Sequence, residues 1–142
     1  AAGVMIEFLK NVLKIIVRSN TGGVGELANF LVGVAYVLPL ALVYQRFPNR
    51  KGVIWGSLLA IFSGAFFAGV LNYFVFIPAY AAVLGYPIEA FISMAAKINS
   101  SVVDLRTLVL FAIVPFNLLK GVIVAVSGLG LFKALQPLWK MY

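Results

Sequence analysis

Three asparagines and one lysine stand within long apolar stretches of this sequence, where polar side chains are rare. Asn117 and Lys120 lie in "PFNLLKGVIV", and Asn29 and Asn72 lie in two earlier apolar stretches. An amide side chain both donates and accepts hydrogen bonds, whereas a lysine ammonium group only donates. These residue types suit the binding of a ligand that carries hydrogen-bond donors and acceptors, and they include no evident pair of nucleophile and base for catalysis.

The composition of the 142-residue chain indicates an integral membrane protein. Hydrophobic residues make up 63% of the sequence and charged residues 11%, and the mean hydropathy is +1.08. A soluble domain has about 45–50% apolar and about 25% charged residues, so the excess of apolar side chains must face lipid. The length predicts a single domain over residues 1–142.

The residue types that are missing exclude several kinds of site. The sequence has no cysteine and no histidine, which excludes disulfides, His-ligated zinc and Ser-His or Cys-His catalysis. We therefore expect no metal, no cofactor and no enzymatic activity. No G-x-x-x-x-G-K-[ST] motif occurs, so active transport would need energy from another protein. The net charge of +7 is explained better by the positive-inside rule than by nucleic-acid binding.

Four apolar stretches predict an all-α bundle of four transmembrane spans. They cover residues 1–17, 25–44, 52–84 and 107–135. The third is longer than one span needs, and we expect Pro78 to end or kink it, because a proline ring clashes with the carbonyl group four residues earlier. Pro115 should bend the first third of the fourth stretch. The first stretch begins without an initiator Met, so we expect the chain to be the later part of a longer protein.

The segment 85–106 is too polar to span a membrane, but its apolar residues follow a helical spacing. We expect a short amphipathic helix on the membrane surface that caps one end of the bundle through Ile88, Phe91, Ile92 and Ala95. Asp104 should be the N-cap of the following span.

Two patterns of small residues have mainly structural interpretations. "GVGELA" resembles a dinucleotide-binding pattern, but it lies between membrane helices and is better explained as a loop and a helix start. A ridge of small residues at intervals of four should pack inside the bundle, and comprises Gly52, Gly56, Ala60, Gly64 and Ala68.

The basic residues predict the orientation of the chain in its membrane. Basic residues without neighbouring acids are Arg46, Arg50 and Lys51 in one loop, and Lys133 and Lys140 near the C-terminus. That loop and the C-terminus should be cytoplasmic. The basic residues at the opposite end lie among acidic ones, as Arg18, Lys97 and Arg106 do among Glu26, Glu89 and Asp104. Residue 1 should start near the cytoplasmic side, with residues 19–26 and 85–106 outside.

This orientation brings the buried polar residues to a shared depth. At 1.5 Å per residue, Asn29 lies one turn into its span, Asn72 about 30 Å above the cytoplasmic start of the third, and Asn117 about 15 Å from the outside. Lys120 lies one turn deeper on the same face as Asn117. The sequence therefore predicts a polar pocket that is open to the outside.

Structural alternatives remain for these residues and for the first helix. Lys120 would have a structural role if it paired with Glu7, and Asn72 and Asn117 would have one if they formed interhelical hydrogen bonds. The first helix has one polar face, which either lines the cavity or lies in the membrane interface. That face consists of Glu7, Lys10, Asn11, Lys14 and Arg18.

Four blocks of the sequence resemble a known transporter family. "GVGELANFLVGVAYVLP", "LNYFVFIPAYA", "INSSVVDLRTLVLFAIVPFNLLKG" and the helix that follows are similar to the riboflavin-specific S components of energy-coupling factor (ECF) vitamin transporters. The resemblance covers essentially the whole chain. It implies a six-helix fold with both termini cytoplasmic, in which residues 1–17 correspond to the third helix. The first two helices and the loop that covers the substrate would then be missing from this chain.

The resemblance also implies a function and a set of binding residues. An S component captures the vitamin outside the cell, and a membrane coupling subunit with two ATPase subunits drives its release inside. The flavin-binding Asn and Lys of the family motif map to Asn117 and Lys120, and the Asn of "LNYF" maps to Asn72. The remaining candidates for riboflavin binding are Asn29, Glu26, Tyr73 and Phe116.

Other functions stay open at this point. FMN would call for more basic residues at the outer mouth than the sequence provides, and another vitamin is a further alternative. A channel-type subunit would need a ring of like residues from several chains, and an intramembrane enzyme would need a nucleophile and a base.

Overall fold

A computed structural model describes the backbone of residues 2–139, and the side chains of these residues except 18, 132 and 135–139. Ala1 and Lys140 were used in predicting the orientation of the chain in the membrane, and both lie outside the described residues. Two of the elements are π-helical turns, labelled η. The elements are α1 (Ala2–Arg18), α2 (Val24–Arg46), α3 (Arg50–Leu71), η1 (Asn72–Phe76), α4 (Ile77–Leu84), α5 (Ile88–Ala96), α6 (Leu105–Leu108), η2 (Val109–Ile113) and α7 (Val114–Trp139).

The described chain is an all-α membrane protein, as the composition predicted. Three helical stretches are long and apolar enough to cross a membrane: Val24–Arg46, Arg50–Leu84 and Leu105–Leu131. The expected fourth span, α1, has only 17 residues and carries Glu7, Lys10 and Lys14. Length and composition do not mark α1 as a span, so its crossing of the membrane stays a prediction.

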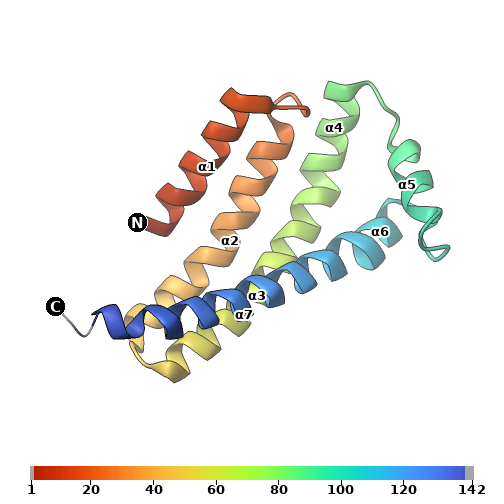
Figure 1. The fold of residues 1–142 in the computed structure, drawn as a ribbon. Coiled ribbons are helices and arrows are strands. Elements are labelled where there is room, and N and C mark those ends of the chain that lie inside the picture. The colour runs from red at the N-terminus through yellow and green to blue at the C-terminus, as the bar shows by residue number, and fades with distance from the viewer. Residues whose placement is uncertain (1, 140–142) are drawn as a thin grey trace.

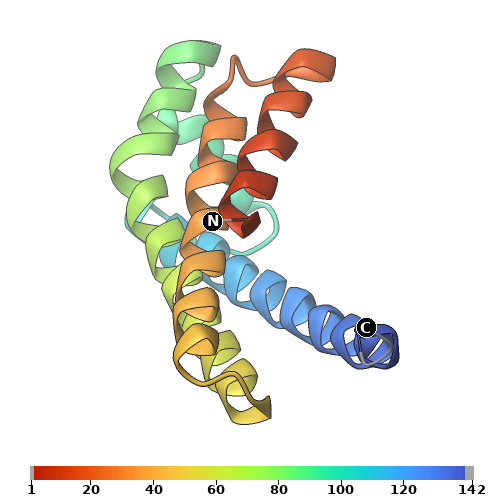
Figure 2. The same ribbon diagram turned by 90° about the vertical axis from the view of Figure 1, so that its left-hand side faces the viewer.

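The ends of the helices agree with the predicted arrangement of loops. Figure 1 shows the turn between α1 and α2 at the same end of the molecule as the turn between α4 and α5, and the turn between α2 and α3 at the opposite end. In the first of these turns Gly22 and Gly23 have φ angles of 58° and 88°, a conformation that glycine adopts without steric cost. The helix-start interpretation of "GVGELA" is therefore confirmed. Figure 2 shows α7 crossing α3 and then diverging from it.

Pro78 was expected to end or to kink its helix, and it does not end it. The helix runs on from α3 through η1 into α4, and the N–H of Ile77 donates to the carbonyl oxygen of Asn72, five residues earlier. The same pattern recurs before Pro115, where the N–H of Val114 donates to the carbonyl oxygen of Val109. Both prolines thus follow a wide π turn, and such turns occur frequently at functional sites.

The small-residue ridge of α3 packs inside the chain, as expected. A Cβ atom added to Gly64 would collide with the ring of Tyr36, and one added to Gly56 would lie 3.0 Å from Leu40. Both partners belong to α2, so the missing side chains let α2 and α3 approach closely.

The segment after α4 forms the predicted cap on one end of the bundle. Helix α5 packs its apolar face on a cluster of four buried residues, and that face consists of Ile88, Phe91, Ile92 and Ala95. Asp104 is the N-cap of α6: its side chain accepts a hydrogen bond from the N–H of Thr107 at 2.7 Å in a capping box. The hydrogen bonds from Thr107 hold the pKa of the Asp104 carboxyl below its usual value.

Candidate functional site

A pocket of about 440 Å³ lies among α2, the α3–η1–α4 helix and the η2–α7 helix. Five of the seven predicted binding residues line it: Asn29, Asn72, Phe116, Asn117 and Lys120. The rest of its wall is mainly apolar or small, and consists of Gly25, Ala28, Val32, Ala68, Tyr80, Ala112 and Ile113. The structure therefore brings together three amides and the lysine from helices far apart in the sequence.

Two of the amides are held by their own helices. The side-chain nitrogen of Asn72 donates to the carbonyl oxygen of Ala68 at 2.7 Å, and that of Asn117 donates to the carbonyl oxygen of Ile113 at 2.9 Å. Within the part of the chain that the structure describes, neither side chain forms the interhelical hydrogen bond that the sequence left open. These bonds fix both side chains in place, and among the described residues the two amide oxygens have no hydrogen-bond partner. Each oxygen can therefore accept a hydrogen bond from a ligand.

Lys120 does not pair with Glu7 in the structure. Glu7 instead forms an ion pair with Lys10, with 2.6 Å between the carboxylate oxygen and the ammonium nitrogen. The Glu7 side chain also packs over Gly33 of α2, where an added Cβ would collide with it. Among the described residues no carboxylate lies within ion-pair distance of Lys120, so its ammonium donors are left for the pocket.

Tyr36 was missed by the sequence analysis, although it positions the binding helix. Its hydroxyl group donates to the backbone carbonyl oxygen of Asn117. Its ring lies against Gly64 of α3 and Gly121 of α7, since a Cβ at either glycine would crowd it. One tyrosine thus fixes α2, α3 and α7 together beside the pocket. A hydroxyl-bearing residue in an otherwise apolar span was the signal that could have found it.

Glu26 lies at the turn between α1 and α2 and does not line the pocket. Its side chain is only 1% exposed. It accepts hydrogen bonds from the hydroxyl groups of Ser19 at 3.0 Å and Thr21 at 2.9 Å, and the ammonium group of Lys14 lies 3.5 Å away. All of these contacts hold the turn together. The pocket wall begins at the neighbouring Gly25.

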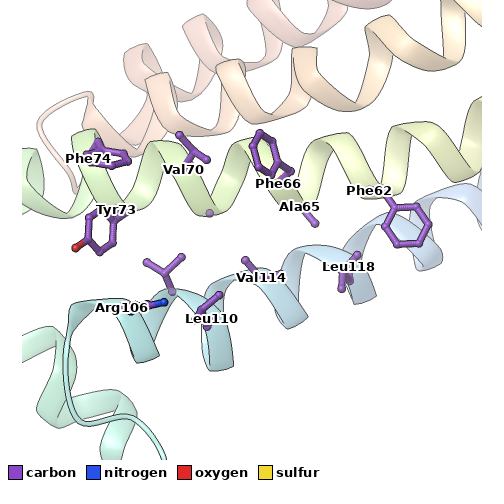
Figure 3. A pocket seen from close by; sticks show the side chains of 12 residues that line it. Phe62, Ala65, Phe66, Val70, Tyr73, Phe74, Arg106, Leu110, Val114 and Leu118 are labelled. Carbon is purple, nitrogen blue, oxygen red and sulfur yellow. The ribbon is translucent and has the colours of Figure 1, made fainter.

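Tyr73 lies in a different cavity from its neighbour Asn72. It lines an apolar groove of about 710 Å³ on the other side of the α3–α7 pair. Figure 3 shows the side chains of this groove, with Tyr73 on one wall and Arg106 and Leu110 on the other. Phe116 and Tyr80 are the aromatic residues that line the polar pocket; Phe74 lines the groove, and Phe30 packs edge-on against Phe8 of α1.

Comparison with known proteins identifies relatives over almost the whole chain. The riboflavin transporter FmnP of Bacillus subtilis is 33% identical over 138 residues, which cover 96% of this chain and 67% of the relative. The riboflavin transporter RibU of Staphylococcus aureus is 28% identical over 139 residues, which cover 98% of this chain and 67% of the relative. The chain thus spans about two thirds of the length of these relatives, and no solved structure gives a significant match.

The match of this chain to a family model agrees with the match to these relatives. The model of the family "ECF transporter, substrate-specific component" matches residues 1–132. This range contains every residue of the polar pocket. Since the match covers most of the chain and the relatives agree with it, the chain belongs to the family of ECF transporter substrate-specific components.

Proposed function

We propose that this chain binds riboflavin from the outer side of a prokaryotic plasma membrane, as the substrate-capture subunit of an ECF-type importer. The observation that carries the proposal is the pocket in which Asn29, Asn72, Asn117 and Lys120 meet. Two relatives, of whose length this chain covers about two thirds, are named riboflavin transporters. Their names support the choice of riboflavin as the ligand.

The chemistry of riboflavin suits the composition of this pocket. Its ring system is neutral, planar and largely apolar, with carbonyl acceptors, and its ribityl chain carries hydroxyl groups. The amide oxygens of Asn72 and Asn117 can accept from hydroxyl or N–H groups, and Lys120 can donate to carbonyl oxygens. Val32 and Phe116 provide apolar contact for the ring. The volume of about 440 Å³ falls within the usual range of about 300–1,000 Å³ for small-molecule pockets.

Lys120 also bears on the choice between riboflavin and FMN. It is the one cationic side chain among the residues that line the pocket. A phosphate group would require further donors, because phosphate is usually bound by several charge-assisted hydrogen bonds. We therefore infer a preference for riboflavin over FMN, which competition between the two ligands would measure.

The proposed transport needs partner subunits. This chain has no nucleotide-binding loop, and its membership of the S-component family implies that a membrane coupling subunit and two ATPase subunits supply the energy. In the proposed orientation the C-terminus and the loop between α2 and α3 are cytoplasmic, because they carry basic residues without neighbouring acids. Reconstituted alone, the protein should bind riboflavin but should not accumulate it in vesicles when ATP is supplied.

The absorption spectrum of the purified protein tests the proposal. A tight flavin site should retain its ligand through purification, so the preparation should be yellow and its flavin fluorescence should stay quenched until the protein is denatured. A colourless preparation that fails to bind added riboflavin, but binds thiamin or biotin, would contradict the assignment of the ligand.

A further inference from the structure

Tyr80 lines the polar pocket but has no part in the riboflavin contacts described so far. It lies on α4, and it is the one residue with a hydroxyl group among those that line the pocket. Among the described residues this hydroxyl group forms no hydrogen bond, and none of their fully buried side-chain oxygen or nitrogen atoms lacks a partner. The hydroxyl group of Tyr80 is therefore accessible, and it can both donate and accept a hydrogen bond.

The hydroxyl group of Tyr80 reaches from α4 to the start of α2. A Cβ atom added to Gly25 would lie 2.7 Å from the Tyr80 oxygen, which is a collision. Gly25 is buried and is part of the pocket wall. The carboxylate of the neighbouring Glu26 does not engage the tyrosine, since it accepts its hydrogen bonds from Ser19 and Thr21. The missing side chain at Gly25 thus gives the tyrosine hydroxyl its room in the pocket.

The ring of Tyr80 is held from two directions. It packs against the buried cluster of Val32, Ala68 and Phe76. Its centroid also lies 6.5 Å from the ring centroid of Phe91, on the helix α5 that caps this end of the bundle. Packing on two sides restricts the rotamers of a side chain. The position of the hydroxyl group is therefore set before a ligand binds, which lowers the cost of ordering it.

Tyr80 and Lys120 lie at different distances from the capped end of the bundle. Tyr80 lies about 6 Å along its helix from the end of α4, whereas Lys120 lies about 22 Å along its helix from the start of α6. Figure 1 shows α5 between the end of α4 and the start of α6. The pocket therefore has one end near the cap, at Tyr80, and a deep end at Lys120.

The two ends of the pocket suit the two parts of riboflavin. Lys120 only donates hydrogen bonds, and the carbonyl oxygens of the ring system are matching acceptors. The hydroxyl groups of the ribityl chain both donate and accept, as a tyrosine hydroxyl does. A ligand with its ring system toward Lys120 would therefore place its ribityl chain toward Tyr80.

We propose that Tyr80 is a ligand-binding residue, whose hydroxyl group forms a hydrogen bond with a hydroxyl group of the ribityl chain next to Gly25. The ring system then lies toward Asn117 and Lys120. Tyr80 thus contributes to the selection of a flavin that carries this chain. This assignment depends on the proposed function, because it takes riboflavin as the ligand.

Lumiflavin tests the assignment, because it has the ring system of riboflavin with a methyl group in place of the ribityl chain. The full chain, freed of bound flavin, would be titrated in detergent with each flavin, and the quenching of flavin fluorescence would give both affinities. Tyr80→Phe removes only the hydroxyl group and should weaken riboflavin binding by about 2- to 10-fold, the effect of one neutral hydrogen bond. Its affinity for lumiflavin should equal that of the wild type.

Two other tyrosines provide matched controls. Tyr73→Phe removes a hydroxyl group from a residue that lines the apolar groove, and should change neither affinity. Tyr36→Phe removes the hydrogen bond to the backbone of Asn117. It should weaken the binding of both flavins by a similar factor, because it displaces a wall of the pocket and not a contact with the ribityl chain. Melting curves report that each variant is folded.

Three results would overturn the proposal and leave the proposed function in place. The first is equal affinity of the wild-type protein for the two flavins, a measurement that needs no variant. The second is unchanged riboflavin affinity in Tyr80→Phe. The third is an equal weakening of both flavins in Tyr80→Phe, which would make Tyr80 a positioning residue as Tyr36 is. A wild-type protein that binds neither flavin would instead overturn the proposed function, and this inference with it.

Discussion

The polar pocket and the apolar groove lie on opposite sides of the same pair of helices. Asn72 lines the pocket and its neighbour Tyr73 lines the groove; on the partner helix Asn117 lines the pocket and Leu118 the groove. Successive residues of an α-helix point about 100° apart, so two adjacent positions can face two different environments. The position of each residue around the helix, more than its depth in the membrane, decides which cavity it serves.

The two cavities also differ in what encloses them. Helix α2 supplies a third wall to the pocket and adds Asn29 to its polar residues. The groove receives no lining residue from α1 or α2 and so has two walls within the described chain. A cavity enclosed by three helices can separate a polar ligand from lipid better than a groove between two helices can. Asn29, Asn72 and Asn117 thus lie in the cavity that this third helix helps to enclose.

The largest expected effect is a loss of riboflavin affinity when Lys120 of the polar pocket is replaced. Lys120→Met keeps the apolar stem and removes the donors, which leaves acceptors of riboflavin unpaired. Affinity should fall by about 1–3 kcal/mol, or about 5- to 150-fold, with the fold retained. Leu118→Met, on the groove side of the same helix, is the matched control and should bind as the wild type does. Quenching of flavin fluorescence measures both.

An unchanged affinity in Lys120→Met would mean that Lys120 does not contact the ligand. The structure pairs Glu7 with Lys10, so Lys120→Met should also keep its thermal stability. A loss of stability that Glu7→Gln restores in the double variant would instead show that Glu7 and Lys120 are coupled.

Glu26 should affect stability more than ligand affinity, in contrast to Lys120. Glu26→Ala leaves the hydroxyl groups of Ser19 and Thr21 without their acceptor at the α1–α2 turn. The apparent melting temperature should fall by several degrees, and Glu26→Gln, which keeps an acceptor oxygen, should fall less. Melting curves in detergent measure the effect. If Glu26→Ala weakened riboflavin binding as strongly as Lys120→Met at a temperature where both are folded, Glu26 would belong to the binding residues after all.

A smaller effect should distinguish the adjacent residues Asn72 and Tyr73. Asn72→Leu removes one amide acceptor from the pocket and should weaken riboflavin binding by about 2- to 10-fold, the effect of one neutral hydrogen bond. Tyr73→Phe changes the groove and should leave riboflavin affinity unchanged. Titrations of both variants under the same conditions make the comparison, and the reverse order of effects would show that η1 faces the ligand with Tyr73.

The smallest effect concerns Asp104, at the end of the molecule where the groove opens. Its pKa is lowered in the folded protein by the hydrogen bonds from Thr107, so its contribution to stability is complete above the unfolded value of about 3.9 and is lost as the pH falls through the folded value. Asp104→Ala should therefore melt below the wild type at neutral pH, and the difference should shrink as the pH is lowered below about 3.9. A difference that stays constant with pH would rule out this carboxylate as the source.

Residue types and helical spacing predicted much of the fold and the assembly of the pocket. The three long spans, the apolar face of α5 and the cap at Asp104 all follow from local patterns. Depth along each span was enough to bring Asn29, Asn72, Asn117 and Lys120 together. Depth could be counted from the sequence because every helical residue adds the same rise.

The direction of a side chain around its helix was harder to predict than its depth. Tyr73 was expected in the pocket but lies in the groove, and the π turn that begins at Asn72 has no signal in the apolar pattern. Glu26 was expected to bind the ligand, but its partners come from the turn between two helices, which the spacing within one helix does not describe. Tyr36 was missed because its partner is a backbone carbonyl group on another helix.

Each of the two π turns determines how the helical segment after it is rotated relative to the segment before it. Each turn adds about one residue to a helical turn and so rotates everything that follows by about 100° relative to an uninterrupted helix. In one helix η1 lies between Ala68 and Tyr80, and in the other η2 lies between Arg106 and Lys120. Each π turn therefore determines in which direction the second residue of its pair points relative to the first. Deleting one residue from either turn would therefore rotate half of a cavity wall away from its ligand without removing any of the side chains that bind it. Homologous sequences that keep the asparagines and the lysine but differ in length between them should be compared at these two places first.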